Sequence, residues 1–161
     1  MFRLIEAALP PLLHRYAYRA AHRLRVHYLR WRGGEIYGVC VIVRDDADRV
    51  LLVRHSYGRR SWSLPGGGRK ADEDPAATAH REMREELGCA LVGLRHLGRT
   101  EHVYHTANNV MDVFTARAGG DVRIDGREIV AAQFFARDAL PQGIAASVRA
   151  LLARLDHSSE S

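Results

Sequence analysis

Three glutamates within five residues are the part of this sequence best suited to chemistry. Glu82, Glu85 and Glu86 lie at positions i, i+3 and i+4 of residues 75–87, a run that reads as a helix. At 3.6 residues per turn their side chains share one face, where like charges repel and destabilise the helix. A solvated acidic face is the alternative, but no lysine interleaves the acids and apolar residues supply a separate buried side. A bound divalent cation would relieve the repulsion, and an all-oxygen ligand set favours Mg²⁺ or Mn²⁺ over zinc.

Both ends of this helix are marked in the sequence. Asp74 is suited to cap its N-terminus, Pro75 to occupy its first turn, and Gly88 to end it. Upstream, residues 66–68 are three consecutive glycines, which predict a loop with an unusually free backbone. The acids therefore lie on a well-delimited helix that follows a glycine loop.

The spacing around the acids is more specific than the acids themselves. Gly67 is followed after five residues by Glu73, and after seven more by the run REMREELGC, residues 81–89. This arrangement matches the pattern G-x5-E-x7-R-E-U-x-E-E-x-G-U, in which U is apolar, at every defined position. Chance agreement is on the order of 10⁻⁹ per starting position. Over residues 67–89 the chain therefore resembles the Nudix hydrolase family, of the small MutT-like type, and this pattern is that family's Nudix box.

The resemblance implies a fold and a reaction. The expected fold class is α/β, namely the Nudix α/β/α sandwich with a mixed β-sheet, from about Ile36 to Leu155. The implied reaction is the Mg²⁺-dependent hydrolysis of a nucleoside diphosphate linked to another group X, with Mn²⁺ as the other candidate ion.

The resemblance also implies roles for individual residues. The family's metal ligands fall on Glu82, Glu85 and Glu86 and on the backbone carbonyl of Gly67. Glu73 and Arg81 complete the expected catalytic set, because residues at these positions hold the loop against the helix and orient the carboxylates. Some members use an acid outside the box as general base, for which Glu101 and Glu128 are candidates, with plain surface acids as the alternative.

The residues expected to bind substrate lie on either side of the box. Arg54, His55 and Arg59 precede the glycine loop and are suited to contact phosphates, with exposed strand-end side chains as the alternative. Tyr104 and Asn109 lie about where some members of the family place specificity residues. A tyrosine at roughly this distance past the box is found in members that cleave diadenosine polyphosphates.

The rest of the pattern supplies a sheet and a second helix. Apolar and β-branched runs predict strands at 36–44, 49–55, 89–101, 110–116 and 131–135, a polar turn at 105–109 and a helix at 144–155. The order of these elements implies a mixed sheet with helices on its faces.

An arginine-rich arm precedes this domain. Residues 1–32 hold seven arginines and one acid, a net charge of +6, whereas the remainder carries 17 basic and 18 acidic residues. Apolar residues recurring at three- and four-residue steps predict an N-terminal amphipathic helix. We therefore divide the chain into this helix (residues 1–34), the Nudix hydrolase domain (35–156) and a flexible tail (157–161). Packing of the helix on the domain is favoured over contact with an anionic surface or a role in targeting.

Length and composition exclude several classes of protein. The 161 residues, 47% apolar and 27% charged, suit one soluble domain. No uncharged apolar stretch approaches the ~18 residues of a membrane span, and two isolated cysteines fit a reducing cytoplasm. We expect a nucleotide substrate and no specific nucleic acid as partner, and a homodimer is left open.

Together these features favour a Mg²⁺-dependent Nudix pyrophosphohydrolase. It would cleave a nucleoside triphosphate to monophosphate and pyrophosphate, or another nucleoside diphosphate linked to X. The alternatives are a dinucleoside polyphosphate or nucleotide-sugar hydrolase, and a non-catalytic nucleotide-binding regulator with the Nudix fold. The complete set of acids argues against the regulator, because binding alone does not require all of them.

Deleting residues 1–32 tests the role of the arm. If the arm only packs, the truncated protein should lose stability while kcat/KM per folded molecule changes little. If the arm attracts a polyanionic substrate, kcat/KM of the full chain should fall as salt shortens the Debye length to about 8 Å at 0.15 M, and the truncated form should lack this dependence. A truncation that keeps its Tm but loses substrate affinity would contradict packing.

Overall fold

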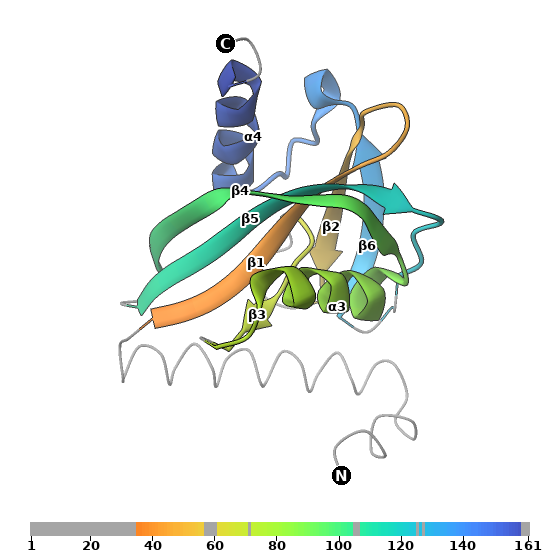
Figure 1. Cartoon of the computed structure of the whole chain (residues 1–161). Coiled ribbons are helices and arrows are strands. Elements are labelled where there is room, and N and C mark those ends of the chain that lie inside the picture. The colour runs from red at the N-terminus through yellow and green to blue at the C-terminus, as the bar shows by residue number, and fades with distance from the viewer. Residues whose placement is uncertain are drawn as a thin grey trace.

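The computed structural model describes residues 35–56, 61–70, 72–104, 107–124, 126 and 128–158. These residues form a mixed β-sheet with helices α3 (Pro75–Leu87) and α4 (Ala146–Ser158) packed on opposite faces (Figure 1). The expected α/β sandwich with a mixed sheet is therefore confirmed. The N-terminal helix predicted from the sequence lies outside the described residues. None of the helices within the described ranges is long and apolar enough to cross a membrane.

Six strands build the sheet. They are β1 (Glu35–Arg44), β2 (Val50–His55), β3 (Gly68–Arg69), β4 (Ala90–Tyr104), β5 (Ala107–Gly119) and β6 (Ile129–Phe135). Their order is β4-β5-β1-β2-β6, and the short β3 pairs with β1 beside this path. β1 runs parallel to β5, whereas the other strand pairs are antiparallel. A 3₁₀ turn, η1 (Arg137–Ala139), links β6 to the segment before α4.

The location of the central strand β1 between two cores explains why its sequence is apolar at almost every position. Val39, Val41 and Val43 pack in the core beneath α3. Ile42, together with the partly buried Cys40, packs in the second core beneath α4. Because both faces of the strand are covered, alternation between apolar and polar residues is lost.

The predicted limits of α3 are confirmed. The Asp74 side chain accepts a hydrogen bond from the Ala77 amide at 2.9 Å, and Gly88 ends the helix in the left-handed conformation at φ 56°. Met83 and Leu87 are fully buried against the sheet. Glu86 and Glu82 lie beside this buried stripe and are largely covered, whereas Glu85 is exposed.

Other boundaries differ from those predicted. The expected polar turn at 105–109 is wrong in its second half, because Asn108 and Asn109 belong to β5 and pair with Glu35 and Ile36 of β1. Pairing on both edges keeps this polar stretch extended. The two-residue β3 and η1 were not predicted, since neither carries a periodic pattern. α4 begins at Ala146 rather than 144 and continues to Ser158, into the expected tail.

A buried ion pair connects β3 to β5, which both pair with the central strand β1. Arg69 Nη2 lies 3.0 Å from Asp112 Oδ2 on β5, and the two side chains are only 4% and 2% exposed. On β4, Arg99 Nε and His96 Nε2 lie 3.2 and 3.1 Å from the other oxygen of Asp112. Burial opposes ionisation of Asp112, but the hydrogen bonds from Arg99, Arg69 and His96 hold its pKa below the ordinary range.

The other side of the Arg69 guanidinium holds the end of the glycine loop. Its Nη1 donates to the carbonyls of Lys70 at 3.0 Å and Glu73 at 3.3 Å. The guanidinium also lies 5.0 Å from the centre of the Tyr37 ring, whose face attracts the positive charge. Arg69 therefore connects a strand in the sheet to the loop that precedes α3.

Asp112→Asn should be strongly destabilising, because it leaves the Arg69 guanidinium buried beside a neutral group. We expect a loss of about 3–5 kcal/mol in the free energy of unfolding, measured by denaturant titration. His96→Gln and Arg99→Met are the controls, since these partners of Asp112 are about half exposed and should cost less than ~1 kcal/mol each. The double variant Asp112→Leu with Arg69→Met should recover much of the lost stability. A mild effect of Asp112→Asn alone would contradict the role of this buried ion pair in stability.

Candidate active site

The acids of α3 meet the glycine loop in one hollow. Glu82, Glu85 and Glu86 project from α3, residues 66–68 form the facing wall, and Glu128 enters from the segment before β6. The hollow has a volume of about 500 Å³. With Glu73, which also lines it, five carboxylates and the backbone of the loop face one water-accessible space.

Glu82 is held in this hollow by a short ion pair. Its carboxylate lies 2.6 Å from Arg81 Nη1, and its side chain is 13% exposed. Burial raises the pKa of Glu82, the Arg81 charge opposes this, and the negative charges of Glu128 and Glu85 raise it further. A positive charge in the hollow would therefore stabilise the ionised carboxylates.

Glu73 and Arg81 form the link between the loop and the acids. Arg81 Nη2 lies 3.2 Å from Glu73 Oε1, while the Lys70 amide donates to Glu73 Oε2 at 3.2 Å. The hydrogen bond from Lys70 lowers the pKa of Glu73, burial opposes it, and Arg81 contributes further lowering. Since Arg81 also holds Glu82, the pair lies between the loop backbone and the carboxylates that line the hollow.

Two of the three loop glycines are required for different reasons. Gly66 has φ 147°, and a Cβ there would lie 2.8 Å from Cys40 Cα. Gly67 does not adopt such a φ, but a Cβ at this position would lie 2.5 Å from Glu82 Oε2. Its carbonyl accepts a hydrogen bond from the Val39 amide at 2.9 Å, which leaves one lone pair for another partner. At Gly67 the constraint is therefore space for the Glu82 carboxylate.

His55, at the end of β2, is the predicted substrate residue that the structure brings closest to the acids. One ligand atom each from His55, Glu86 and Glu128 lies within 4.8 Å of the other two. Glu86 is only 5% exposed. With Glu82 and Glu85 alongside, the donor set of carboxylates and one imidazole fits a divalent cation.

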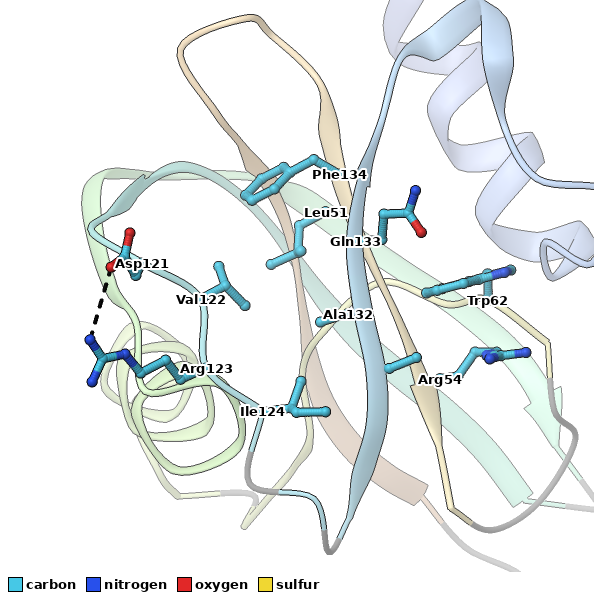
Figure 2. A pocket seen from close by; sticks show the side chains of 11 residues that line it. Leu51, Arg54, Trp62, Asp121, Val122, Arg123, Ile124, Ala132, Gln133 and Phe134 are labelled. Carbon is cyan, nitrogen blue, oxygen red and sulfur yellow. Dashed lines mark ion pairs between the residues drawn. The ribbon is translucent and has the colours of Figure 1, made fainter.

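Arg54, the neighbour of His55, lies elsewhere. It is exposed, and its guanidinium stacks 4.9 Å from the centre of the Trp62 ring. Arg54 and Trp62 line a larger hollow of about 730 Å³ along the edge strand β6, where Val122 and Ile124 lie on the other side of the strand (Figure 2). This hollow shares no lining residue with the acid hollow.

A third hollow, of about 260 Å³, lies between the sheet and α4. Asn109, Cys40 and Met111 are among its mainly apolar lining. Burial raises the pKa of the Cys40 thiol to about 12, so the thiol is neutral there. A Cβ at Gly38 would lie 2.7 Å from Met111 Sδ and 3.0 Å from the Gly67 carbonyl oxygen. Gly38 thus lies between this apolar cavity and the loop of the acid hollow.

The remaining sequence candidates are not brought to these sites by the described residues. Arg59 lies outside the described ranges, as does the side chain of Tyr104, whose backbone belongs to β4. Glu101 is exposed on β4 and does not line the acid hollow, whereas Glu128 does. Sequence reasoning missed Arg69 and its partner on β5. The signal available for it was a single acid inside the apolar run VMDVFTA, since an acid buried in a strand needs a partner.

Comparison with known proteins gives a consistent picture. An RNA pyrophosphohydrolase from Methylococcus capsulatus is 41% identical over 63 residues, which cover 39% of this chain and 32% of that protein. The NAD-capped RNA hydrolase NudC from Mycobacterium tuberculosis is 35% identical over 127 residues, 76% of this chain and 37% of that protein. The chain therefore spans about a third of the length of these curated relatives.

A solved structure agrees with these matches. The MutT Nudix hydrolase from Burkholderia pseudomallei superposes with a TM-score of 0.67 at 28% identity, covering 74% of this chain and 96% of that one. The family model of the NUDIX domain matches residues 35–155, which include every element that lines the acid hollow. On this match, the chain belongs to the Nudix family.

Proposed function

We propose that this chain hydrolyses the diphosphate linkage of a nucleotide with the help of a divalent cation, and that its preferred substrate class is the nucleoside triphosphates. The observation that carries this proposal is the meeting of five carboxylates in one hollow against the glycine loop. Such a set of charges is costly without a cation, and a cation there would attract phosphate oxygens.

The acids of α3 hold the ion in this proposal. Glu82, Glu85 and Glu86 bind Mg²⁺, or Mn²⁺ in its place, and the carbonyl of Gly67 has a lone pair that can join them. When bound, the ion neutralises phosphate charge and promotes attack by water. Arg81 positions Glu82, and Glu73 positions Arg81, so the carboxylate geometry is set before substrate arrives.

The apolar cavity beside Gly38 is the proposed nucleoside site. It lies across Gly38 from the loop of the acid hollow, so a nucleotide can place its base among apolar groups while its phosphates face the acids. Asn109 supplies an amide that can pair with a base edge, and Ser63 and Thr100 add hydroxyl groups. The cavity is lined mostly by apolar atoms, which suits a flat aromatic ring.

The reaction is a hydrolysis in which atoms balance simply. Water adds to one phosphorus, the bridging P–O bond breaks, and both products leave as phosphates with release of a proton. For a nucleoside triphosphate the products are a monophosphate and pyrophosphate. Because relatives of this chain carry the names RNA pyrophosphohydrolase and NAD-capped RNA hydrolase, the 5′ end of an RNA is a further candidate for X.

A panel of substrates tests the proposal. Nucleoside triphosphates, dinucleoside polyphosphates, nucleotide sugars and a 5′-triphosphorylated oligonucleotide are incubated with the full chain and Mg²⁺, and the products are separated by chromatography. We expect cleavage at a diphosphate linkage, fastest for the triphosphates. If none is cleaved with either Mg²⁺ or Mn²⁺, the chain is a non-catalytic nucleotide-binding domain.

Variants of the helix acids connect this activity to the hollow. Glu85→Gln and Glu86→Gln should each lower kcat by at least ~10²-fold, since each removes charge from the site that holds the ion. Glu101→Gln is the matched control, because this exposed acid lies outside the hollow and should leave kcat unchanged. Near wild-type rates for both helix variants at limiting Mg²⁺ would refute the site.

A substitution in the glycine loop tests the geometry independently of charge. Gly67→Ala should lower activity by at least ~10-fold, because its Cβ displaces the Glu82 carboxylate that it would otherwise meet at 2.5 Å from Oε2. Gly143→Ala is the control, since a Cβ there meets nothing closer than 4.0 Å and should be neutral. Unchanged kcat and metal affinity in Gly67→Ala would show that this carboxylate is not held as the structure has it.

A further inference from the structure

One group of side chains combines two acids of the hollow with a histidine beside it, and is not confined to the Nudix box. His55 ends β2, Glu86 lies in the last turn of α3, and Glu128 precedes β6. One possible ligand atom from each lies within 4.8 Å of the other two. Only Glu86 belongs to the box, and only His55 offers a nitrogen.

The backbone around His55 aims its side chain at the acids. By strand alternation the His55 side chain lies on the same face of the sheet as Leu51 and Val53, which pack beneath α3. The register of β2 with β6 shifts so that Arg54 pairs with Ala131 and His55 with Ile129, and the extra residue belongs to β6. The Ser56 amide donates to the carbonyl oxygen of Glu128 at 2.8 Å. This hydrogen bond fixes the segment carrying Glu128 beside the end of β2. The two side chains are therefore brought together by the backbone rather than by flexible loops.

We propose that His55, Glu86 and Glu128 form one cation position with two carboxylate oxygens and one imidazole nitrogen, and that this position prefers a first-row transition-metal dication to Mg²⁺. Ligand atoms held at about 2.1 Å from one ion are about 3 Å apart when adjacent and about 4.2 Å apart when opposite, so atoms that lie within 4.8 Å of one another come into range by side-chain rotation. The inference rests on the proposed function, because Glu86 also belongs to the Mg²⁺ ligands proposed there.

The nitrogen ligand is what sets the preference. Mg²⁺ favours oxygen ligands, whereas imidazole suits transition metals, whose affinities rise from Mn²⁺ towards Cu²⁺. Glu82 and Glu85 present only oxygens, so Glu86 lies between two chemically different sets of donors: the carboxylates of the hollow and the group that includes His55. The competing interpretation is the one drawn from sequence, in which His55 contacts a phosphate of the substrate.

Pulsed electron paramagnetic resonance of the full chain with Mn²⁺ alone, without nucleotide, separates these interpretations. We expect a ¹⁴N coupling to the bound Mn²⁺ that disappears in His55→Gln and persists in His80→Gln, a control histidine on α3 outside the three-residue group. Titration should show Mn²⁺ affinity lowered by at least about tenfold in His55→Gln, with Mg²⁺ affinity changed less than about twofold. Wild-type chain labelled with ¹⁵N-histidine provides a readout without any variant, since the coupling must change from ¹⁴N to ¹⁵N.

The outcomes distinguish failure of this inference from failure of the proposed function. Mn²⁺ that binds without nitrogen coupling overturns the inference alone, and a raised KM for His55→Gln would then identify His55 as a phosphate contact. A coupling that persists in His55→Gln also overturns it. If the wild-type chain binds neither Mn²⁺ nor Mg²⁺, the inference and the proposed function both fail.

Discussion

Repulsion among carboxylates is the constraint around which this domain is arranged. Glu82, Glu85, Glu86 and Glu128 face one hollow, where burial and mutual repulsion keep the pKa of Glu82 above its ordinary value. Arg81 offsets part of that repulsion through Glu82 and Glu85, and Arg69 and Lys70 also line the hollow. In the proposed function, a bound dication relieves the remaining repulsion, so that stability and activity would both respond to the same ion.

Two ion pairs fix the glycine loop that faces the acids, one at the surface of the hollow and one in the interior. Glu73 and Arg81 connect the glycine loop to α3 at the surface of the hollow. Beneath them, the buried pair of Arg69 and Asp112 connects the same loop to β5. Because buried ion pairs contribute little net stability but fail badly when one partner is lost, this pair makes the position of the loop sensitive to a residue far away in sequence.

Local features of the site could be predicted from the sequence, and features set by tertiary contacts could not. The caps of α3 and the shared face of its glutamates follow from spacing alone, and Met83 and Leu87 are buried as expected. The closeness of His55 to Glu128 depends on the pairing of β2 with β6, which no short pattern signals.

The same division explains the other differences. Arg54 adjoins His55 in sequence, but strand alternation directs it to the Trp62 ring on the other face. Asn109 was expected in a turn, yet pairing with β1 keeps it in β5 and brings it to the cavity beneath α4. For Asn109 the deciding partner, Ile36, lies far along the chain, so only the assembled sheet defines its surroundings.

Thermal unfolding as a function of Mg²⁺ concentration tests the central claim most directly. If the hollow stores repulsion that a dication relieves, Tm should rise with Mg²⁺, by about 5–10 °C at one hundred times the dissociation constant. In Glu82→Gln, Tm without metal should equal or exceed that of the wild type, and its rise with Mg²⁺ should be much smaller. A wild-type Tm that does not respond to Mg²⁺ across the millimolar range would contradict the account.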